Sequence, residues 1–168
     1  PPRSTLFPYT TLFRSILMVC LGNICRSPLA EGIMRKKLND FNINAEVDSC
    51  GFESFHTGDR PDQRGIEVAQ KNGIDISGHR ARLFRVADFE EFDYIFVMDQ
   101  RNYADVASVA RNPHDMDKVD FIMNMAYPGS NTPVPDPYFG GRADFRKTWE
   151  MLDEATDKII DQIINIKL

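Results

Sequence analysis

The stretch that decides the fold is "VCLGNICRSP", residues 19–28. It overlaps a short apolar run, "ILMVC" at 16–20, that predicts a buried strand. Pro28 predicts the first turn of a helix, where the missing N–H of proline costs nothing. The strand ends on Cys20 and Arg26 follows just before the helix, so both lie where parallel α/β sheets bind ligands. The loop between them is the first candidate site.

The rest of the chain alternates apolar runs with helical periods. We expect strands over 16–20, 43–50, 92–99 and 118–123, and helices over 28–38, 61–73 and from about Asp99 to before Pro113. The last helix carries a core-facing stripe formed by Phe145, Trp149, Leu152, Thr156, Ile159 and Ile163. This order predicts a single α/β domain with a four-stranded parallel sheet and helices on both faces, in which the candidate loop follows the first strand. The proline- and glycine-rich stretch 127–141 predicts a surface loop.

The beginning of the chain differs in character from the remainder. Residues 1–15, "PPRSTLFPYTTLFRS", have no helical or strand period and no acidic residue. The part "TLFPYTTLFRS" resembles the translation of a sequencing-adapter oligonucleotide. The apolar run Ile16–Leu21 is too short for the core of a secretory signal. We therefore expect residues 1–15 to be a non-native leader and residues 16–168 to form the domain.

The size and charge of this domain limit the classes of molecule that it is expected to bind. About 150 residues remain after the leader, enough for one domain with its own core. Without the two arginines of the leader, the formal charge changes from -5 to -7. Nucleic acids and anionic membranes attract positive surfaces, so neither is expected as a partner. No apolar stretch approaches the roughly 20 residues of a membrane-spanning helix.

The cysteine content indicates a reducing compartment. Cys20, Cys25 and Cys50 are too few and too clustered for a secreted disulfide scaffold. They also lack zinc spacing, since no CxxC pair or paired histidine accompanies them. The sequence therefore predicts a cytoplasmic protein with no metal and no cofactor, in which each cysteine needs its own explanation.

The loop chemistry favours attack on a phosphoryl group. A thiolate is the reactive form of cysteine, and successive backbone N–H groups together with a helix N-terminus stabilise an anion. We expect Gly22 to permit unusual backbone torsions and Asn23 to tolerate a left-handed conformation. Arg26 offers a planar fork that holds two oxygens at once. The predicted phosphate-binding residues are Leu21, Gly22, Asn23, Ile24, Cys25 and Arg26.

The nine residues "CLGNICRSP" at 20–28 resemble the phosphate loop of the low-molecular-weight protein tyrosine phosphatases. The similarity continues in order through the chain with "DSCG" (48–51), "PDQRG" (61–65), "GHRAR" (78–82), "FDYIFVMD" (92–99) and "DPYF" (136–139). The resemblance implies a tyrosine-phosphorylated protein or a small aryl phosphate as the partner. It also implies a monomer or weak dimer.

The same resemblance implies roles for individual residues. Cys20 would attack phosphorus and form a cysteinyl-phosphate, while Arg26 and the loop amides hold the phosphate oxygens. Asp136 would protonate the leaving phenolate and then assist the hydrolytic water. Ser27 would donate a hydrogen bond to the Cys20 thiolate. Cys25 would protect the nucleophile by forming a disulfide after oxidation.

Aromatic walls are expected around the slot, because a phosphotyrosine ring needs flat apolar faces. By resemblance the slot is lined by Phe55, His56, Tyr138 and Phe139, with phenylalanine at 139 where tyrosine is common. Ser49 and His79 resemble residues that support Asn23 by hydrogen bonds. His114 is expected only on a surface loop.

Other functions use similar loops. Protein arginine phosphatases resemble this chain closely but tend to carry threonine where it has Ile24. Arsenate reductases of this fold need further cysteines downstream, and none follows Cys50. Sugar-transport phosphocarrier domains lack counterparts of Arg26 and Asp136. A non-catalytic phosphate-binding module is the remaining alternative.

Overall fold

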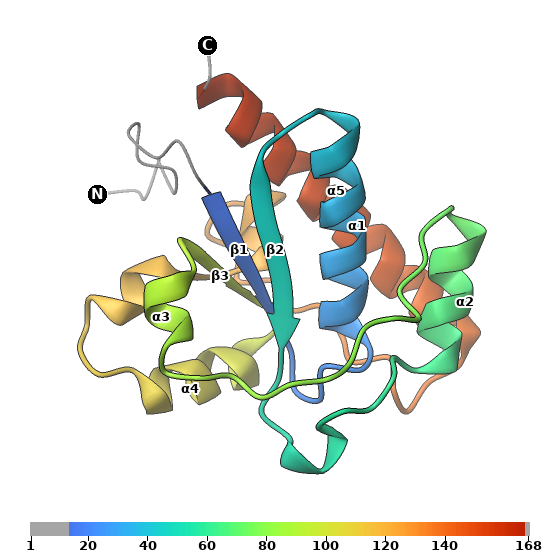
Figure 1. Ribbon diagram of the computed structural model, residues 1–168, viewed down its shortest axis with the longest axis horizontal. Helices are drawn as coiled ribbons and strands as arrows, with labels where there is room; N and C mark the ends of the chain where they lie inside the picture. The colour runs from blue at the N-terminus through green and yellow to red at the C-terminus, as the bar shows by residue number, and fades with distance from the viewer. Residues whose placement is uncertain (1–13, 167–168) are drawn as a thin grey trace.

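The computed structural model describes residues 14–166, and Figure 1 shows a central sheet between two groups of helices. The sheet has the order β2-β1-β3-β4, and every neighbouring pair is parallel. Its strands are β1 (Arg14–Val19), β2 (Ala45–Cys50), β3 (Tyr94–Val97) and β4 (Val119–Phe121). The predicted four-stranded parallel sheet is confirmed.

Helices cover both faces of the sheet, as expected. On one face lie α1 (Arg26–Asp40) and α5 (Arg142–Ile166), with α2 (Gln63–Lys71) beside them. On the other lie α3 (Asp88–Glu91) and α4 (Gln100–Val109). Short 3-10 helices are η1 (Ser54–His56), η2 (Asp115–Lys118) and η3 (Ile122–Met125).

The apolar run of β1 is buried on both sides because each face of the sheet has its own core. Ile16 and Met18 pack in the core beneath α1, α2 and α5. Leu17 and Val19 point the other way, into the core beneath α3 and α4. All four side chains are fully buried. A strand buried on both faces has no polar alternation, which explains the continuous apolar run in the sequence.

Several predicted boundaries differ from the structure by a few residues, and those of the first strand and the first helix bear on the candidate loop. The first strand begins at Arg14 and pairs with β2 from there, so the last two residues of the excluded segment 1–15 belong to the sheet. Ser15 is buried, and its hydroxyl donates to the carbonyl of Glu91 at 2.9 Å. Helix α1 begins at Arg26 rather than at Pro28, because proline fits anywhere in the first helical turn, whose N–H groups have no intrahelical partner. The other leader residues lie outside the described part of the chain.

The C-terminal helix and the loop before it agree with the sequence. Every member of the predicted stripe on α5 is buried. The stretch 127–141 contains no helix or strand, as expected for a loop. Val134 is nevertheless fully buried, and its N–H donates to the carbonyl of Met98 just beyond β3 at 2.8 Å. No helix within residues 14–166 is both long and apolar enough to cross a membrane.

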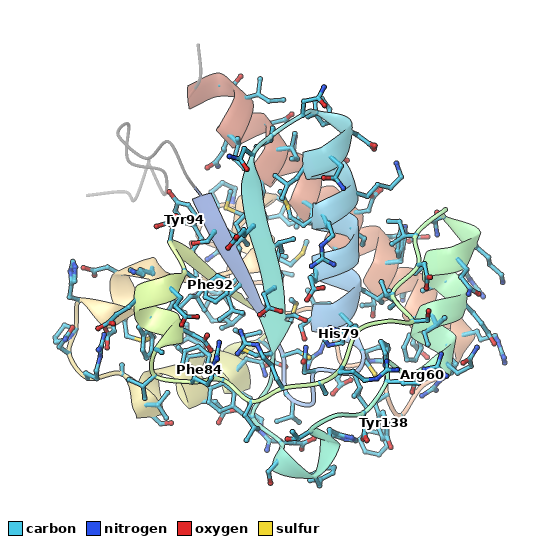
Figure 2. All side chains as sticks on the ribbon, viewed as in Figure 1. Arg60, His79, Phe84, Phe92, Tyr94 and Tyr138 are labelled. Carbon is cyan, nitrogen blue, oxygen red and sulfur yellow. The ribbon has the colours of Figure 1, made fainter. Side chains whose placement is uncertain are left out.

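The strand order places a crevice at the carboxyl edge of the sheet. After β1 the chain moves outward to β2, then returns past β1 to β3 and β4. Ligands bind outside the carboxyl ends of the strands where the winding direction changes, which here is between β1 and β3. Figure 2 shows His79, Arg60 and Tyr138 in the loops at this edge, towards which the arrowhead of β2 points. The loop that comes after β1 lies in the same region.

Candidate active site

The loop after β1 curls around the sulfur of Cys20. This side chain is buried, with 2% of its surface exposed. Its Sγ lies 3.0 Å from the hydroxyl of Ser27 and accepts a hydrogen bond from the backbone N–H of Asn23 at 3.3 Å. Both contacts come from the loop or the first turn of α1. The Cys20 sulfur and these two partners therefore lie within one short segment.

Asn23 fixes the shape of the loop. Its backbone has φ +56, the left-handed conformation that asparagine tolerates better than most residues. Its amide nitrogen donates to the hydroxyls of Ser27 at 2.7 Å and Ser49 at 2.9 Å. Its amide oxygen accepts from the backbone N–H of Arg82 at 3.0 Å and lies 3.1 Å from Nε2 of His79. The side chain thus connects α1, β2 and the segment that carries His79 and Arg82 to the loop.

Glu31 extends this network into α1. Its Oε1 accepts the Ser49 hydroxyl proton at 2.8 Å, and its Oε2 pairs with Arg35 at 2.9 Å. Burial lowers the pKa of His79, although the Glu31 carboxylate 3.7 Å away acts in the opposite direction. The neutral ring then donates from Nε2 to Asn23. Ser49 and His79 support the loop through Asn23, as the family resemblance implied, whereas no pattern in the sequence singled out Glu31.

Two glycines allow the loop to pack closely. The predicted reason for Gly22 is wrong: its φ is not positive, but a Cβ would come within 3.0 Å of the His56 ring. Gly51, for which the sequence predicted no role of its own, lies beneath the loop. A Cβ there would meet the carbonyl oxygen of Leu21 at 2.7 Å and the nitrogen of Asn23 at 2.9 Å. Backbone atoms cannot move aside as a flexible side chain can, so this approach requires glycine.

Arg26 is almost fully buried, with 1% of its surface exposed. Its Nη1 donates to Asp99 at 2.7 Å and to the carbonyl of Val134 at 2.9 Å. Burial acts to lower the Arg26 pKa, but Cys20 and the Asp99 hydrogen bond outweigh it and raise the pKa, so the guanidinium stays charged. Within the described chain its Nε is a buried donor with no hydrogen-bond partner. A phosphate oxygen in the loop would satisfy this donor.

Asp99 is a residue of the site that sequence reasoning missed. Its Oδ1 caps α4 by accepting from the backbone N–H of Asn102 at 2.9 Å, while its Oδ2 holds Arg26. The sequence predicted a helix start near Asp99 but gave this residue no role in the site. Its role could have been predicted from the position of Asp99 just beyond β3, because polar side chains at the carboxyl ends of neighbouring parallel strands converge.

Asp136 reaches the site from the loop before α5. Its Oδ2 lies 3.5 Å from Nη2 of Arg26, and its Oδ1 accepts from the backbone N–H of Tyr138 at 3.1 Å. About a third of the carboxylate side chain, 36%, is exposed. Although 110 residues separate Asp136 from Arg26 in the chain, they meet beside Cys20 in one pocket. The geometry brings a thiol, a buried guanidinium group and a carboxyl group around one volume.

The pocket has a volume of about 240 Å³ and an aromatic mouth. Its lining includes Cys20, the loop residues Leu21, Gly22, Ile24, Cys25 and Arg26, and the four predicted slot residues Phe55, His56, Tyr138 and Phe139. Phe55 and Phe139 are strongly exposed, at 72% and 93%. His56 is held at the rim by Asp59, with Nδ1 and Oδ2 2.9 Å apart. A flat ring can therefore pass between aromatic walls on its way to Cys20.

The remaining cysteines and histidine have simpler surroundings. Cys25 also lines the pocket, but burial and the nearby Cys20 raise the pKa of its thiol. Cys50 is fully buried, and burial raises the pKa of its thiol as well. All three cysteines are free thiols. His114 is exposed on a loop, as expected.

Two further features bear on the choice of site. A larger cavity of about 510 Å³ lies between α2 and α5, but none of the phosphate loop lines it. The smaller pocket is the candidate site because Cys20, Arg26 and Asp136 line it. Among residues 14–166, no group of three or more His, Cys, Asp and Glu side chains is placed to hold a metal ion.

The fold and the pocket together define a single-domain α/β protein in which a cysteine, an arginine and a carboxylate line one pocket. The family model of low molecular weight phosphotyrosine protein phosphatase matches residues 15–167. The chain belongs to this family, which confirms the resemblance and the enzyme class, a protein-tyrosine-phosphatase.

Similar proteins are known from sequence and from structure. The low molecular weight phosphotyrosine protein phosphatase of Schizosaccharomyces pombe is 39% identical over 151 residues, which cover 88% of this chain and 96% of that protein. The protein tyrosine phosphatase of Entamoeba histolytica is 33% identical with a TM-score of 0.84, covering 92% of this chain and 99% of that one. A Drosophila arginine phosphatase is 29% identical with a TM-score of 0.81, covering 87% and 95%. The similar proteins therefore include a tyrosine phosphatase and an arginine phosphatase, the two kinds of protein phosphatase that the sequence analysis considered.

Proposed function

We propose that this protein hydrolyses phosphotyrosine through a covalent cysteinyl-phosphate. The observation that carries the proposal is the Nε of Arg26, a buried donor with no partner in the described chain, in the loop that surrounds the Cys20 sulfur. Such a donor is costly unless an oxygen reaches it. A bound phosphate dianion supplies that oxygen and lies within reach of the thiolate.

The reaction proceeds in two steps. The Cys20 thiolate attacks phosphorus while the bond to the phenolic oxygen breaks, and Asp136 gives its proton to the leaving oxygen. Arg26 and the loop N–H groups hold the three equatorial oxygens as charge develops. A water molecule then attacks phosphorus, Asp136 takes its proton, and the thiolate leaves. The Ser27 hydroxyl, 3.0 Å from the sulfur, stabilises the departing thiolate.

Phosphoarginine is the alternative substrate, and the Drosophila arginine phosphatase is the observation that favours it. The apolar side chain of Ile24 in the pocket lining supports phosphotyrosine instead, because it offers no hydrogen bond to a guanidinium group.

A direct test compares peptides of one sequence that carry phosphotyrosine or phosphoarginine. We expect kcat/KM to be at least about tenfold higher for phosphotyrosine, the scale of discrimination by pocket contacts. Ile24→Thr should reduce that ratio, because the added hydroxyl gives the pocket a polar contact. A native protein that prefers the phosphoarginine peptide would make arginine phosphatase the better assignment.

Cys25 is proposed to protect the nucleophile against oxidation. Peroxide would oxidise the Cys20 thiolate to sulfenic acid with release of hydroxide, and the Cys25 sulfur would then form a disulfide with loss of water. Cys25 is buried beside the same pocket, in the loop that also holds Cys20. Its raised pKa leaves it as a thiol until the sulfenic acid has formed.

The expected result is reversible inactivation. After peroxide and then dithiothreitol, the native protein should recover most of its activity and Cys25→Ser little, with a Cys20–Cys25 link seen by mass spectrometry. Cys50→Ala is the control and should recover like the native protein. Equal recovery of the native protein and Cys25→Ser would leave Cys25 with a packing role only.

The setting of the enzyme is inferred from the same features. We propose a cytoplasmic location, supported by the three free thiols, which a reducing compartment preserves. The proposed substrate is a tyrosine-phosphorylated protein or a small aryl phosphate. The proposed oligomeric state of the enzyme is a monomer or a weak dimer.

A further inference from the structure

Arg64, in the first turn of α2, makes an unusual set of contacts outside the phosphate loop. Its Nε and Nη2 donate to the two carboxylate oxygens of Asp62 at 3.0 and 2.8 Å. Its outer nitrogens also donate to the carbonyls of Gly140 at 2.7 Å and Tyr138 at 2.9 Å. The Phe145 ring lies 4.5 Å from the guanidinium carbon. Four hydrogen bonds and the Phe145 ring therefore hold the guanidinium plane of Arg64 in a single orientation.

These contacts join the two halves of the active site. On one side, the backbone N–H of Asp62 donates to the carbonyl of Ile24 in the phosphate loop at 2.8 Å. On the other, Tyr138, whose carbonyl Arg64 holds, donates its own N–H to Oδ1 of Asp136 at 3.1 Å. A continuous chain of hydrogen bonds thus runs from the phosphate loop through Arg64 to the carboxyl group of Asp136.

The loop that carries Asp136 is fixed on both sides of that residue. Before it, the carbonyl of Val134 accepts from Arg26 at 2.9 Å. After it, the carbonyls of Tyr138 and Gly140 accept from Arg64. The loop has no helix or strand of its own, so these contacts replace the hydrogen bonds that regular structure would supply.

We propose that Arg64 is a positioning residue that sets the distance between Asp136 and the phosphate held by the loop. The proposal rests on the proposed function, in which Asp136 is the general acid. Arg64 itself does not line the pocket, so it acts through the loop and not on the substrate. The planar fork is essential because its three nitrogens reach the two oxygens of Asp62 and the two carbonyls from separate positions, whereas the N–H groups of an ammonium all start from one atom.

The test uses Arg64→Ala and Arg64→Lys with two substrates, phenyl phosphate and p-nitrophenyl phosphate. We expect kcat/KM for phenyl phosphate to fall on the order of 10- to 100-fold, the scale of a misplaced catalytic group. The loss should be smaller for p-nitrophenyl phosphate, whose leaving group needs less protonation. Lysine keeps the charge but not the fork, so it should restore little activity. A uniform loss for both substrates would overturn the proposal.

Two controls separate positioning from general damage. Arg142→Ala removes another arginine of this region, one that pairs with Glu67 at 3.0 Å and does not line the active-site pocket, and it should leave both rates unchanged. Vanadate affinity and the far-UV circular dichroism of the Arg64 variants should match those of the native protein. If Arg64→Ala fails to fold, Arg64→Lys carries the same comparison.

A double-mutant cycle with Asp136→Asn then decides the mechanism. If Arg64 acts through the acid, Arg64→Ala should add almost no further loss once Asp136 cannot donate a proton. Full additivity, with Asp136→Asn alone showing leaving-group dependence, would overturn the role of Arg64 and keep the proposed acid. An Asp136→Asn protein without leaving-group dependence would instead overturn both assignments.

Discussion

Cys20→Ser is expected to abolish phosphatase turnover while phosphate and vanadate binding remain measurable. A hydroxyl in the same place is a far weaker nucleophile than a thiolate, so the loss should be on the order of 10⁵-fold or more, the scale seen when a covalent nucleophile is removed. Binding survives because the oxygens are held by Arg26 and the loop N–H groups, which the substitution leaves intact. Steady-state hydrolysis of p-nitrophenyl phosphate and calorimetric titration with vanadate measure the two properties.

The matched control for this experiment is Cys50→Ser. Cys50 is the last residue of β2 and its backbone carbonyl accepts from the Cys20 N–H at 3.3 Å, but it does not line the pocket. Cys50→Ser should lower the free energy of unfolding more than it lowers the rate of the chemical step. Residual activity of Cys20→Ser close to that of the native protein would show that another group attacks phosphorus. Loss of activity on treatment with a chelator would also contradict a mechanism carried by cysteine.

The second large effect is expected for Asp136→Asn. An asparagine cannot protonate the leaving phenolate, so hydrolysis of phenyl phosphate should slow by about 10²–10⁴-fold, the usual contribution of a positioned acid. The amide keeps the size of the side chain and its oxygen can still accept from the Tyr138 N–H, so the loop should stay in place. Measuring kcat/KM across phenols of decreasing pKa gives the leaving-group dependence.

The loss caused by Asp136→Asn should shrink as the leaving group becomes more acidic. Asp59→Asn is a useful comparison, because Asp59 is a rim carboxylate that binds His56 and does not line the pocket. It should leave the leaving-group dependence of the native protein unchanged. If Asp136→Asn slowed all substrates equally, the carboxyl group would be structural and the acid would lie elsewhere.

The loop at 20–28 made the predicted anion-binding segment around Cys20 readable from sequence, because its residues lie within one short segment. Cys20, Asn23 and Ser27 are separated by a few residues, and a strand end followed by a helix start is enough to bring them around one sulfur. Asp136 could be assigned only by resemblance. Its distance in the chain from Arg26 gives no local reason for the two to meet.

The sequence by itself therefore determined the parallel sheet, the two-sided burial of β1 and the position of the loop that follows it, since periodicity and turn residues are local properties. Tertiary structure alone decided which distant groups support that loop. Asp99 meets Arg26, Gly51 lies against the loop backbone, and Arg64 joins it to the loop of Asp136. These contacts exist because parallel strands bring the loops after their carboxyl ends to one edge, and no local pattern in the chain records which side chains meet there.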